Sequence, residues 1–156
     1  MSNTKKIYGI TSILFLMDQI TKMVVSHKMR LQQEITIIPN FFSLIYVKNT
    51  GAAFSILENN SLLLIIISVL AIVMIQKYIK KIPNLEPLEW ISIGLLLGGI
   101  FGNLIDRIIY HAVIDFLSFI IIGYYFPIFN VADIGITVGI CLLILSQLIK
   151  KKEEEK

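Results

Sequence analysis

Four long apolar segments dominate this sequence, and each has the length of a membrane-spanning helix. They occupy roughly residues 7–25, 62–78, 88–109 and 131–149. A helix needs about 20 apolar residues to cross the ~30 Å hydrocarbon layer of a bilayer. Composition agrees, since 56% of the residues are hydrophobic and only 16% are charged, against about 45–50% and about 25% in soluble domains. We therefore expect a mainly α-helical membrane protein, a four-transmembrane-helix bundle.

Lysine placement predicts how the bundle is oriented. Lysines precede the first segment, separate the second from the third and follow the fourth: Lys5, Lys6, Lys77, Lys80, Lys81, Lys150, Lys151 and Lys152. Positive charge marks the cytoplasmic side, so we expect both termini to be cytoplasmic, in a single domain of residues 1–156. A cleaved signal peptide is the less favoured interpretation of the first segment, because Asp18 and Lys22 follow with no small-residue cleavage site.

The two outward connections have the pattern of strands rather than of loops. In residues 26–61, β-branched and aromatic residues lie on both sides of Pro39-Asn40, which predicts a strand, a turn and a second strand. Residues 110–130 are also strand-rich and could pair with them or dip into the interface. Open strand edges do not occur in hydrocarbon, so we expect a small extracytoplasmic β-sheet at the membrane surface. The run 120–126 is too short to be a fifth span.

Polar side chains inside apolar spans are costly and are functional candidates for that reason. They are Asp18, Asn103, Asp106, Arg107 and Asp133. At ~1.5 Å per residue, counting from the inner ends puts Asp106 ~27 Å and Asp133 ~26 Å up, near the outer boundary, and Asp18 ~16 Å up, near the midplane. Asp115 follows the third span on the outer side, so the ionisable groups of the outer boundary should lie in one layer.

Several of these residues also have a purely structural explanation. Asp18 and Lys22 are spaced i, i+4 and could neutralise one another on a helix face. Arg107 shares a helix face with Asn103 and could anchor the helix to lipid phosphate. Asp133 could be favoured at a helix N-terminus by the macrodipole.

Glycines recur every four residues in the third segment, at Gly94, Gly98 and Gly102. Such a stripe of small residues lets another helix approach closely. It predicts tight packing just below Asn103 and Asp106 rather than chemistry of its own.

Few side chains in the sequence could serve as a catalytic nucleophile or a metal ligand, and this limits the possible reaction types. Cys141 lies deep in the fourth segment and is best explained as a packing residue. A dyad of Ser26 with Lys22 would need a neutral lysine, which Asp18 opposes. No cluster with metal-ligand spacing and no glycine-rich nucleotide loop occurs in the sequence, so we expect no metal and no cofactor.

A close pair of carboxylates remains. Two such groups share one proton, so that the ionised member accepts a proton from an attacking water while the protonated member donates to the developing oxyanion. Asp115 and Asp133 are placed to act in this way near the outer membrane face. Their spacing permits this aspartic-protease chemistry without establishing it.

Five short blocks occur in order along nearly the whole chain. They are Asp18-Gln19-Ile20-Thr21-Lys22, Asn49-Thr50-Gly51-Ala52-Ala53-Phe54-Ser55, Gly98-Gly99-Ile100-Phe101-Gly102-Asn103-Leu104-Ile105-Asp106-Arg107, Val113-Ile114-Asp115-Phe116 and Phe129-Asn130-Val131-Ala132-Asp133. Together they resemble lipoprotein signal peptidase, or signal peptidase II, a family of bacterial inner-membrane aspartyl proteases. One block alone would be weak, but five in order make coincidence very unlikely.

The resemblance implies an aspartic endopeptidase with Asp115 and Asp133 as its catalytic acids. It implies supporting roles around the substrate for Asp18, Lys22, Asn49, Gly51, Asn103, Arg107 and Asn130. The implied substrate is a prolipoprotein whose cysteine carries diacylglyceryl, cut on the N-terminal side of that cysteine. His111 departs from the family, which usually has glycine four residues before the first catalytic acid. This departure puts the local turn in question, not the acid.

These inferences predict where the protein works and with what. We expect a multi-pass protein of the bacterial cytoplasmic (inner) membrane, with the active site near the outer face. Its partners should be the lipid-modified prolipoprotein and membrane lipid, with no nucleic acid, and it should be a monomer. The alternative is a small proton-coupled transporter, whose acids should lie near the midplane, where only Asp18 does. An assembly protein using the glycine stripe would leave the outer acids without a purpose.

Overall fold

The computed structural model describes residues 3–51, 60–81 and 85–154, which form long helices and a small sheet. The elements are α1 (Asn3–Lys28), β1 (Glu34–Ile38), β2 (Phe42–Asn49), α2 (Ser61–Lys81), α3 (Pro87–Tyr110), β3 (Val113–Ile121), β4 (Tyr124–Tyr125) and α4 (Val131–Glu154). The four helices are long and apolar enough to cross a membrane. The four predicted spans are confirmed, and most helix ends lie a few residues farther out because flanking polar residues continue the helix.

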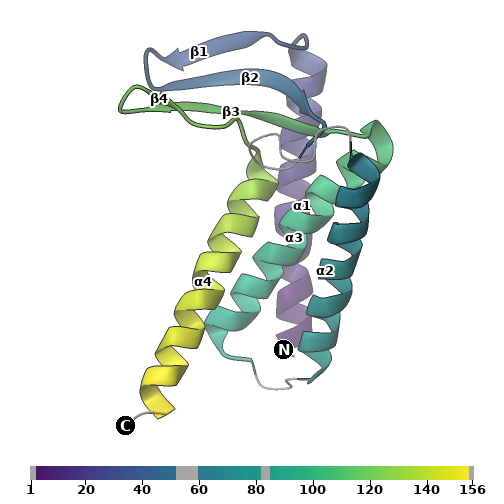
Figure 1. Ribbon diagram of the computed structural model, residues 1–156, viewed down its shortest axis with the longest axis vertical. Helices are drawn as coiled ribbons and strands as arrows, with labels where there is room; N and C mark the ends of the chain where they lie inside the picture. The colour runs from purple at the N-terminus through teal and green to yellow at the C-terminus, as the bar shows by residue number, and fades with distance from the viewer. Residues whose placement is uncertain (1–2, 52–59, 82–84, 155–156) are drawn as a thin grey trace.

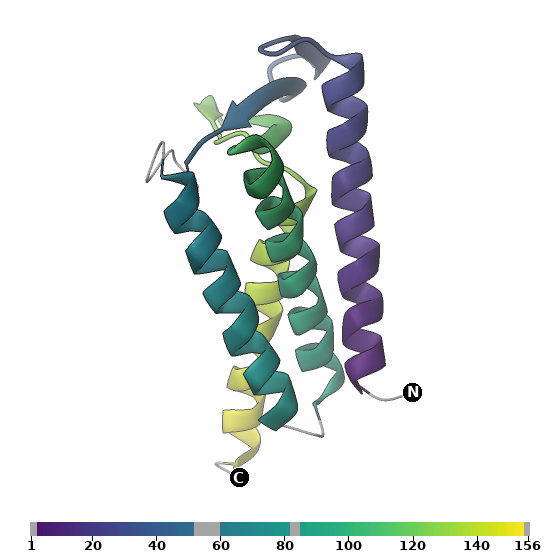
Figure 2. The ribbon, with the colours of Figure 1, turned by 90° about the vertical axis from the view of Figure 1, so that its right-hand side faces the viewer.

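α3 is the central helix of the bundle. It packs against α1, α2 and α4, and 61% of its apolar segment is buried, compared with 11% for α2. The helices run side by side with the sheet across one end, and α1 begins and α4 ends at the opposite end (Figure 1). In the rotated view, α1 and α2 lie on opposite sides of α3 (Figure 2). Every helix therefore connects the sheet end to the lysine-rich end.

The glycine stripe of α3 explains how closely α1 approaches. A Cβ atom added at Gly94 would lie 2.8 Å from the Cβ of Ile10, and one at Gly98 would lie 2.9 Å from the Cβ of Leu14. Real Cβ atoms essentially never come this close, so the predicted tight packing is confirmed. Gly102, one turn farther along, faces a carboxylate of α1 instead of an apolar side chain.

The C-terminus of α3 turns directly into the sheet at His111. This residue adopts the left-handed conformation, with φ 54° and ψ 16°, and its backbone N–H donates to the carbonyl of Arg107. A C-cap in this conformation is usually glycine, which carries no Cβ penalty. The turn implied by the family pattern is therefore preserved, with a histidine side chain accommodated at its strained position.

The sheet is antiparallel, in the order β1-β2-β3-β4. The first two strands form the predicted hairpin around Pro39-Asn40, and β3 pairs with β2, as the strand-rich second connection suggested. A buried cluster of Val25, Met29, Tyr46, Ile114 and Phe116 packs the end of α1 against β2 and β3. This packing holds the sheet across the bundle and places the start of β3 directly above α3 and α4.

Candidate functional site

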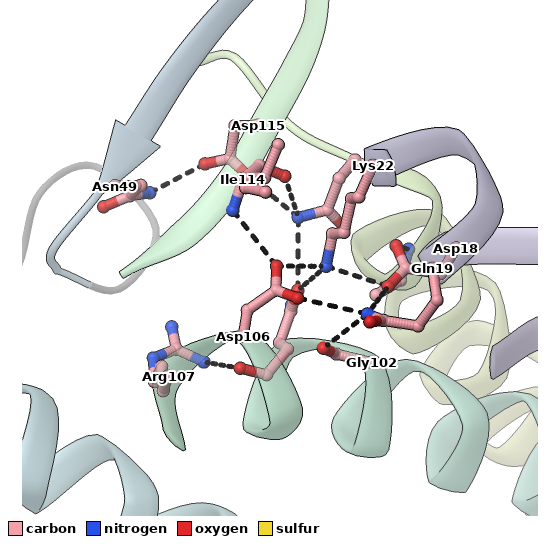
Figure 3. A network of polar contacts seen from close by, with 12 residues as sticks. Asp18, Gln19, Lys22, Asn49, Gly102, Asp106, Arg107, Ile114 and Asp115 are labelled. Atoms are coloured by element: carbon pink, nitrogen blue, oxygen red, sulfur yellow. Dashed lines mark hydrogen bonds and ion pairs between the residues drawn. The ribbon is translucent and has the colours of Figure 1, made fainter. Parts of the chain in front are cut away.

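Asp115 lies near the start of β3 and is only 2% exposed. Its Oδ2 accepts a hydrogen bond from Nδ2 of Asn49 at 2.9 Å (Figure 3), and its Oδ1 accepts one from Nδ2 of Asn130 at 2.6 Å. Burial, and next the negative charge of Asp133, raise the pKa of Asp115 from 3.8 to about 7. Asp115 can therefore hold a proton or release it near neutral pH.

Asp133 occupies the first turn of α4, where Asn130 is the N-cap. The backbone N–H of Asp133 donates to Oδ1 of Asn130 at 2.9 Å, and the backbone N–H of Asn130 donates to Oδ2 of Asp133 at 3.2 Å. This reciprocal arrangement is a capping box, so the structural explanation of Asp133 is correct. The same side chain also lines a large cavity together with Asp115, so capping and a site role coexist.

Two buried asparagines link the pair of acids. Asn130 donates from Nδ2 to both Asp115 and Oδ1 of Asn103, the latter at 3.1 Å. Asn103 in turn donates from Nδ2 to Oδ1 of Asp133 at 2.8 Å. The two aspartates, predicted to lie in one layer, are thus joined by a continuous set of hydrogen bonds.

Lys22 lies at the centre of a second group, on the α1 side. Its ammonium is 2.8 Å from Oδ2 of Asp18 and 2.9 Å from Oδ2 of Asp106 (Figure 3). It also donates to Oδ1 of Asn103 at 2.9 Å. All three ionic side chains are 2% exposed or less. The predicted pairing of Asp18 with Lys22 is confirmed, and Asp106 joins it.

The alternative nucleophiles do not reach this site. The three contacts of Lys22 use its three N–H groups, and the exposed Ser26 hydroxyl donates to a carbonyl of its own helix, so the serine–lysine dyad is wrong. Cys141 is exposed on α4. The interpretation of Cys141 as a packing residue is therefore also wrong, because this position faces outward from the bundle.

Asp18 lies closer to the acids than its sequence position suggested. Its Oδ1 accepts a hydrogen bond from the backbone N–H of Ala132, the residue before Asp133, at 2.8 Å. α1 begins at Asn3 rather than Ile7, which adds ~6 Å to the count along the helix. Asp18 therefore lies level with the first turn of α4, next to the residue that precedes Asp133.

Gln19 was missed by the sequence analysis. Its Nε2 donates to Oδ2 of Asp18 at 3.2 Å, to Oδ1 of Asp106 at 3.1 Å and to the carbonyl of Gly102 at 3.2 Å. Gln19 occupies a variable position of its motif, and an exposed-looking glutamine in a helix carries no signal of such a role.

Arg107 points into the bundle rather than toward lipid. Its Nη2 donates to the carbonyl of Gly51 at 3.2 Å, and its Nη1 contacts the carbonyl of Asn103 at 3.4 Å. The interpretation of Arg107 as an anchor to lipid phosphate is therefore wrong. Gly51 is held in turn by its N–H, which donates to Oδ1 of Asn49 at 2.9 Å. The rest of that motif, residues 52–55, lies outside the described residues.

A cavity of about 940 Å³ lies beneath the sheet, among α2, α3 and α4. Its polar end is formed by Asn49, Asn103, Arg107, Asp115 and Asp133. Its apolar part is formed by side chains of α2, α3 and α4, among them Ile67, Ala71, Ile100, Ile134, Ile136 and Val138. The cavity thus presents two carboxylates at the end of a long apolar groove.

Comparison with known proteins gives the same picture. The family model of signal peptidase (SPase) II matches residues 10–149. The lipoprotein signal peptidase of Symbiobacterium thermophilum is 45% identical over 141 residues, which cover 90% of this chain and 93% of the relative. That of Maridesulfovibrio salexigens is 40% identical over 144 residues, covering 88% and 92%.

Solved structures agree with these relatives. A bacterial membrane enzyme determined by the in meso method at 2.3 Å resolution has a TM-score of 0.87 and 32% identity, covering 94% of this chain and 89% of its own. A second such structure, at 1.9 Å resolution, has a TM-score of 0.81 and 32% identity, covering 89% and 90%.

Fold and site together define a membrane enzyme of the aspartic protease class. The chain belongs to the signal peptidase II family. The proton-coupled transporter left open by the sequence is not supported.

Proposed function

We propose that this chain removes the signal peptide from diacylglyceryl-modified prolipoproteins, cutting on the N-terminal side of the lipidated cysteine. Asp115 and Asp133 are its catalytic pair. The observation that carries the proposal is that both carboxylates line one cavity whose remaining walls are largely apolar. The relatives named lipoprotein signal peptidase supply the substrate class.

The pair has the asymmetry that peptide hydrolysis needs. Asp115, with its pKa raised to about 7, carries the shared proton, and Asp133 is assigned the role of general base. Asp133 takes a proton from water as the water oxygen attacks the scissile carbonyl, while Asp115 donates its proton to the oxyanion. Asp133 then gives its proton to the leaving amine as the C–N bond breaks, and Asp115 regains one from the collapsing diol.

The supporting residues hold the two acids and the wall of the cavity in place. Asn49 and Asn130 hold the two oxygens of Asp115, and Asn103 holds Asp133. Arg107 fixes Gly51 at the cavity edge. Asp18 and Lys22 lie behind this layer, and we assign them no contact with substrate.

The apolar part of the cavity suits the lipid and the signal helix. Ile67 and Ala71 of α2 and Ile134 and Val138 of α4 face it from two sides. Acyl chains and an apolar helix would enter this part from the bilayer, so close packing rather than removal from water would hold them there. The lipid would hold the scissile bond at the level of the acids.

The orientation follows from the ends of the bundle. The lysine clusters lie at the end opposite the sheet (Figure 1), so that end is cytoplasmic and both termini are inside. The sheet and the acids then lie near the outer face of the bacterial inner membrane. The apolar edge of the sheet, where Ile122 and Tyr125 are exposed, would contact membrane lipid. A single chain supplies both acids, so the enzyme acts as one domain and as a monomer.

Purified enzyme tests the substrate assignment. A precursor carrying diacylglyceryl on its cysteine should be cleaved, and the same precursor without the lipid should not. Equal cleavage of both would contradict the assignment of the apolar cavity to the lipid.

A further inference from the structure

Two backbone N–H groups beside the proposed catalytic pair donate to buried carboxylates. The N–H of Ile114, the residue before Asp115, donates to Oδ2 of Asp106 at 3.1 Å (Figure 3). The N–H of Ala132, the residue before Asp133, donates to Oδ1 of Asp18 at 2.8 Å. The backbone next to Asp115 is thus bound by a side chain of α3, and the backbone next to Asp133 by a side chain of α1.

Lys22 joins these two holding points. Its ammonium is 2.8 Å from Oδ2 of Asp18 and 2.9 Å from Oδ2 of Asp106, the latter being the same oxygen that accepts from Ile114. We call Asp18, Lys22 and Asp106 the Lys22 cluster. A continuous chain of polar contacts therefore runs from the backbone of β3 to the backbone of α4 through this cluster.

A buried ionic group of this kind is costly compared with apolar packing. Neither element needs it to form, because β3 pairs with β2 and α4 is capped by Asn130. The distance between β3 and α4 is held on one side by the pairing of Leu117 with Phe129 and by the bond from Asn130 to Asp115. The Lys22 cluster spans the same distance a second time, on the α1 side.

We propose that the Lys22 cluster is a positioning device that fixes the separation of Asp115 from Asp133. The inference rests on the proposed function of these two acids as the catalytic pair. Asp106 thereby joins the supporting residues as a positioning residue. Lys22 acts by positioning both acids and does not touch the substrate.

The separation matters because two carboxylates share a proton only when they are close. Their interaction weakens with distance, and misplacement by about 1 Å can cost about 100-fold in rate. The charged groups near Asp115 and Asp133 are Lys22, Asp106 and Arg107, with Asp18 behind them, and Lys48 of β2 lines the same cavity. α2 brings only uncharged side chains to the cavity among its described residues.

Two substitutions at Asp106 separate position from charge. In Asp106→Asn, the amide oxygen can still accept from Ile114 and Lys22, while the charge and the hydrogen bond from Gln19 are lost. In Asp106→Ala the contacts with Ile114 and Lys22 are lost as well. We expect kcat for the lipidated precursor to fall less than about 10-fold in the first variant and at least about 100-fold in the second, with KM changed less than about 2-fold in both.

The pH profile adds a readout that a merely structural role would not move. Loosening the pair weakens the repulsion that Asp133 exerts on Asp115, so the alkaline limb of activity should move to lower pH in Asp106→Ala by about 0.5 unit or more. Asp106→Asn should move it less. Equal kcat and equal limbs in the two variants would overturn the proposal, because charge alone would then explain both.

A glycine substitution perturbs the cluster without changing any charge. A Cβ at Gly102 would lie 2.4 Å from Oδ2 of Asp18, whereas the atoms nearest to a Cβ at Gly94 belong to the side chain of Ile10 and a backbone carbonyl of α1. Both Gly102→Ala and Gly94→Ala should lower the thermal midpoint. Only Gly102→Ala should lower kcat and move the alkaline limb.

The two proposals fail in different ways. Suppose that Asp115→Asn and Asp133→Asn are inactive, but Gly102→Ala and Gly94→Ala have the same kcat and the same alkaline limb of activity. The positioning role is then wrong and the catalytic pair stands. If the Asn variants of the acids cleave normally, the catalytic pair itself is wrong. If Asp106→Ala does not fold, the comparison of Gly102→Ala with Gly94→Ala tests the positioning role instead.

Discussion

Asn130 donates from Nδ2 to Oδ1 of Asp115 at 2.6 Å, although Asn130 is itself the N-cap of the helix that carries Asp133. One side chain therefore both starts α4 and holds the acid on β3. Ordinary capping does not require asparagine, since serine caps about as well. The longer amide is needed for the second contact.

Asn130→Ser separates these two tasks. Serine keeps the cap but is too short to reach Asp115 and Asn103, so we expect cleavage to fall at least about 10-fold and the thermal midpoint to fall because buried acceptors lose their donor. Asn130→Ala should be equally impaired in cleavage and lose about 1 kcal/mol more stability than Asn130→Ser, because the cap is lost as well. Thermal unfolding in detergent and cleavage of a lipidated precursor measure the two effects. Full activity of the serine variant would show that the contact to Asp115 is dispensable.

Stability should depend on pH through Asp115. The pKa of Asp115 is about 7 in the folded protein, above the ordinary 3.8, so the folded state binds more protons between these values. Stability from this group is therefore lost as pH rises from about 4 to about 7, by up to about 4 kcal/mol.

Asp115→Asn removes this titration. The thermal midpoint of the variant should fall less than that of the unaltered protein between pH 5 and pH 8. Parallel pH dependences would show that burial does not raise the pKa of Asp115.

His111→Gly should stabilise the protein without loss of activity. His111 has φ 54°, where a side chain costs about 1 kcal/mol and glycine costs little. We expect a higher thermal midpoint for His111→Gly and a lower one for His111→Ala, which keeps the Cβ and lacks the polar ring. An inactive but folded glycine variant would reveal a function of the imidazole.

Membrane orientation can be tested by cysteine labelling. In a Cys141→Ser background, Glu34→Cys in β1 should react with a membrane-impermeant thiol reagent in intact cells. Lys152→Cys in α4 should react only after permeabilisation, because we propose that the lysine-rich end is cytoplasmic. The reverse pattern would invert the proposed topology.

The helices and the sheet were predictable because their signals are local. Segment length and lysine placement are sufficient to locate the spans, and Pro39-Asn40 marks the first hairpin. The contacts of Gln19 and the inward direction of Arg107 were not predictable. Both depend on how the helices pack against one another. At Gly102, for example, the missing side chain leaves room for Asp18 of α1, and this becomes visible only once α1 and α3 are packed together.

The level of Asp18 relative to α4 was likewise not predictable from its own helix. Counting along one helix needs its true start, and α1 begins at Asn3, ahead of the apolar run. Asp133 shows how two roles can share one residue, because its capping box and its place at the cavity use different bonds.

Cleavage by variants of the two acids tests the central claim most directly. Purified Asp115→Asn and Asp133→Asn are compared with the unaltered enzyme on a diacylglyceryl-modified precursor, with thermal unfolding confirming that each variant is folded. We predict that each folded variant loses at least about 1000-fold in kcat, because neither proton transfer of the pair can then be completed. Substantial cleavage by either variant would contradict the account.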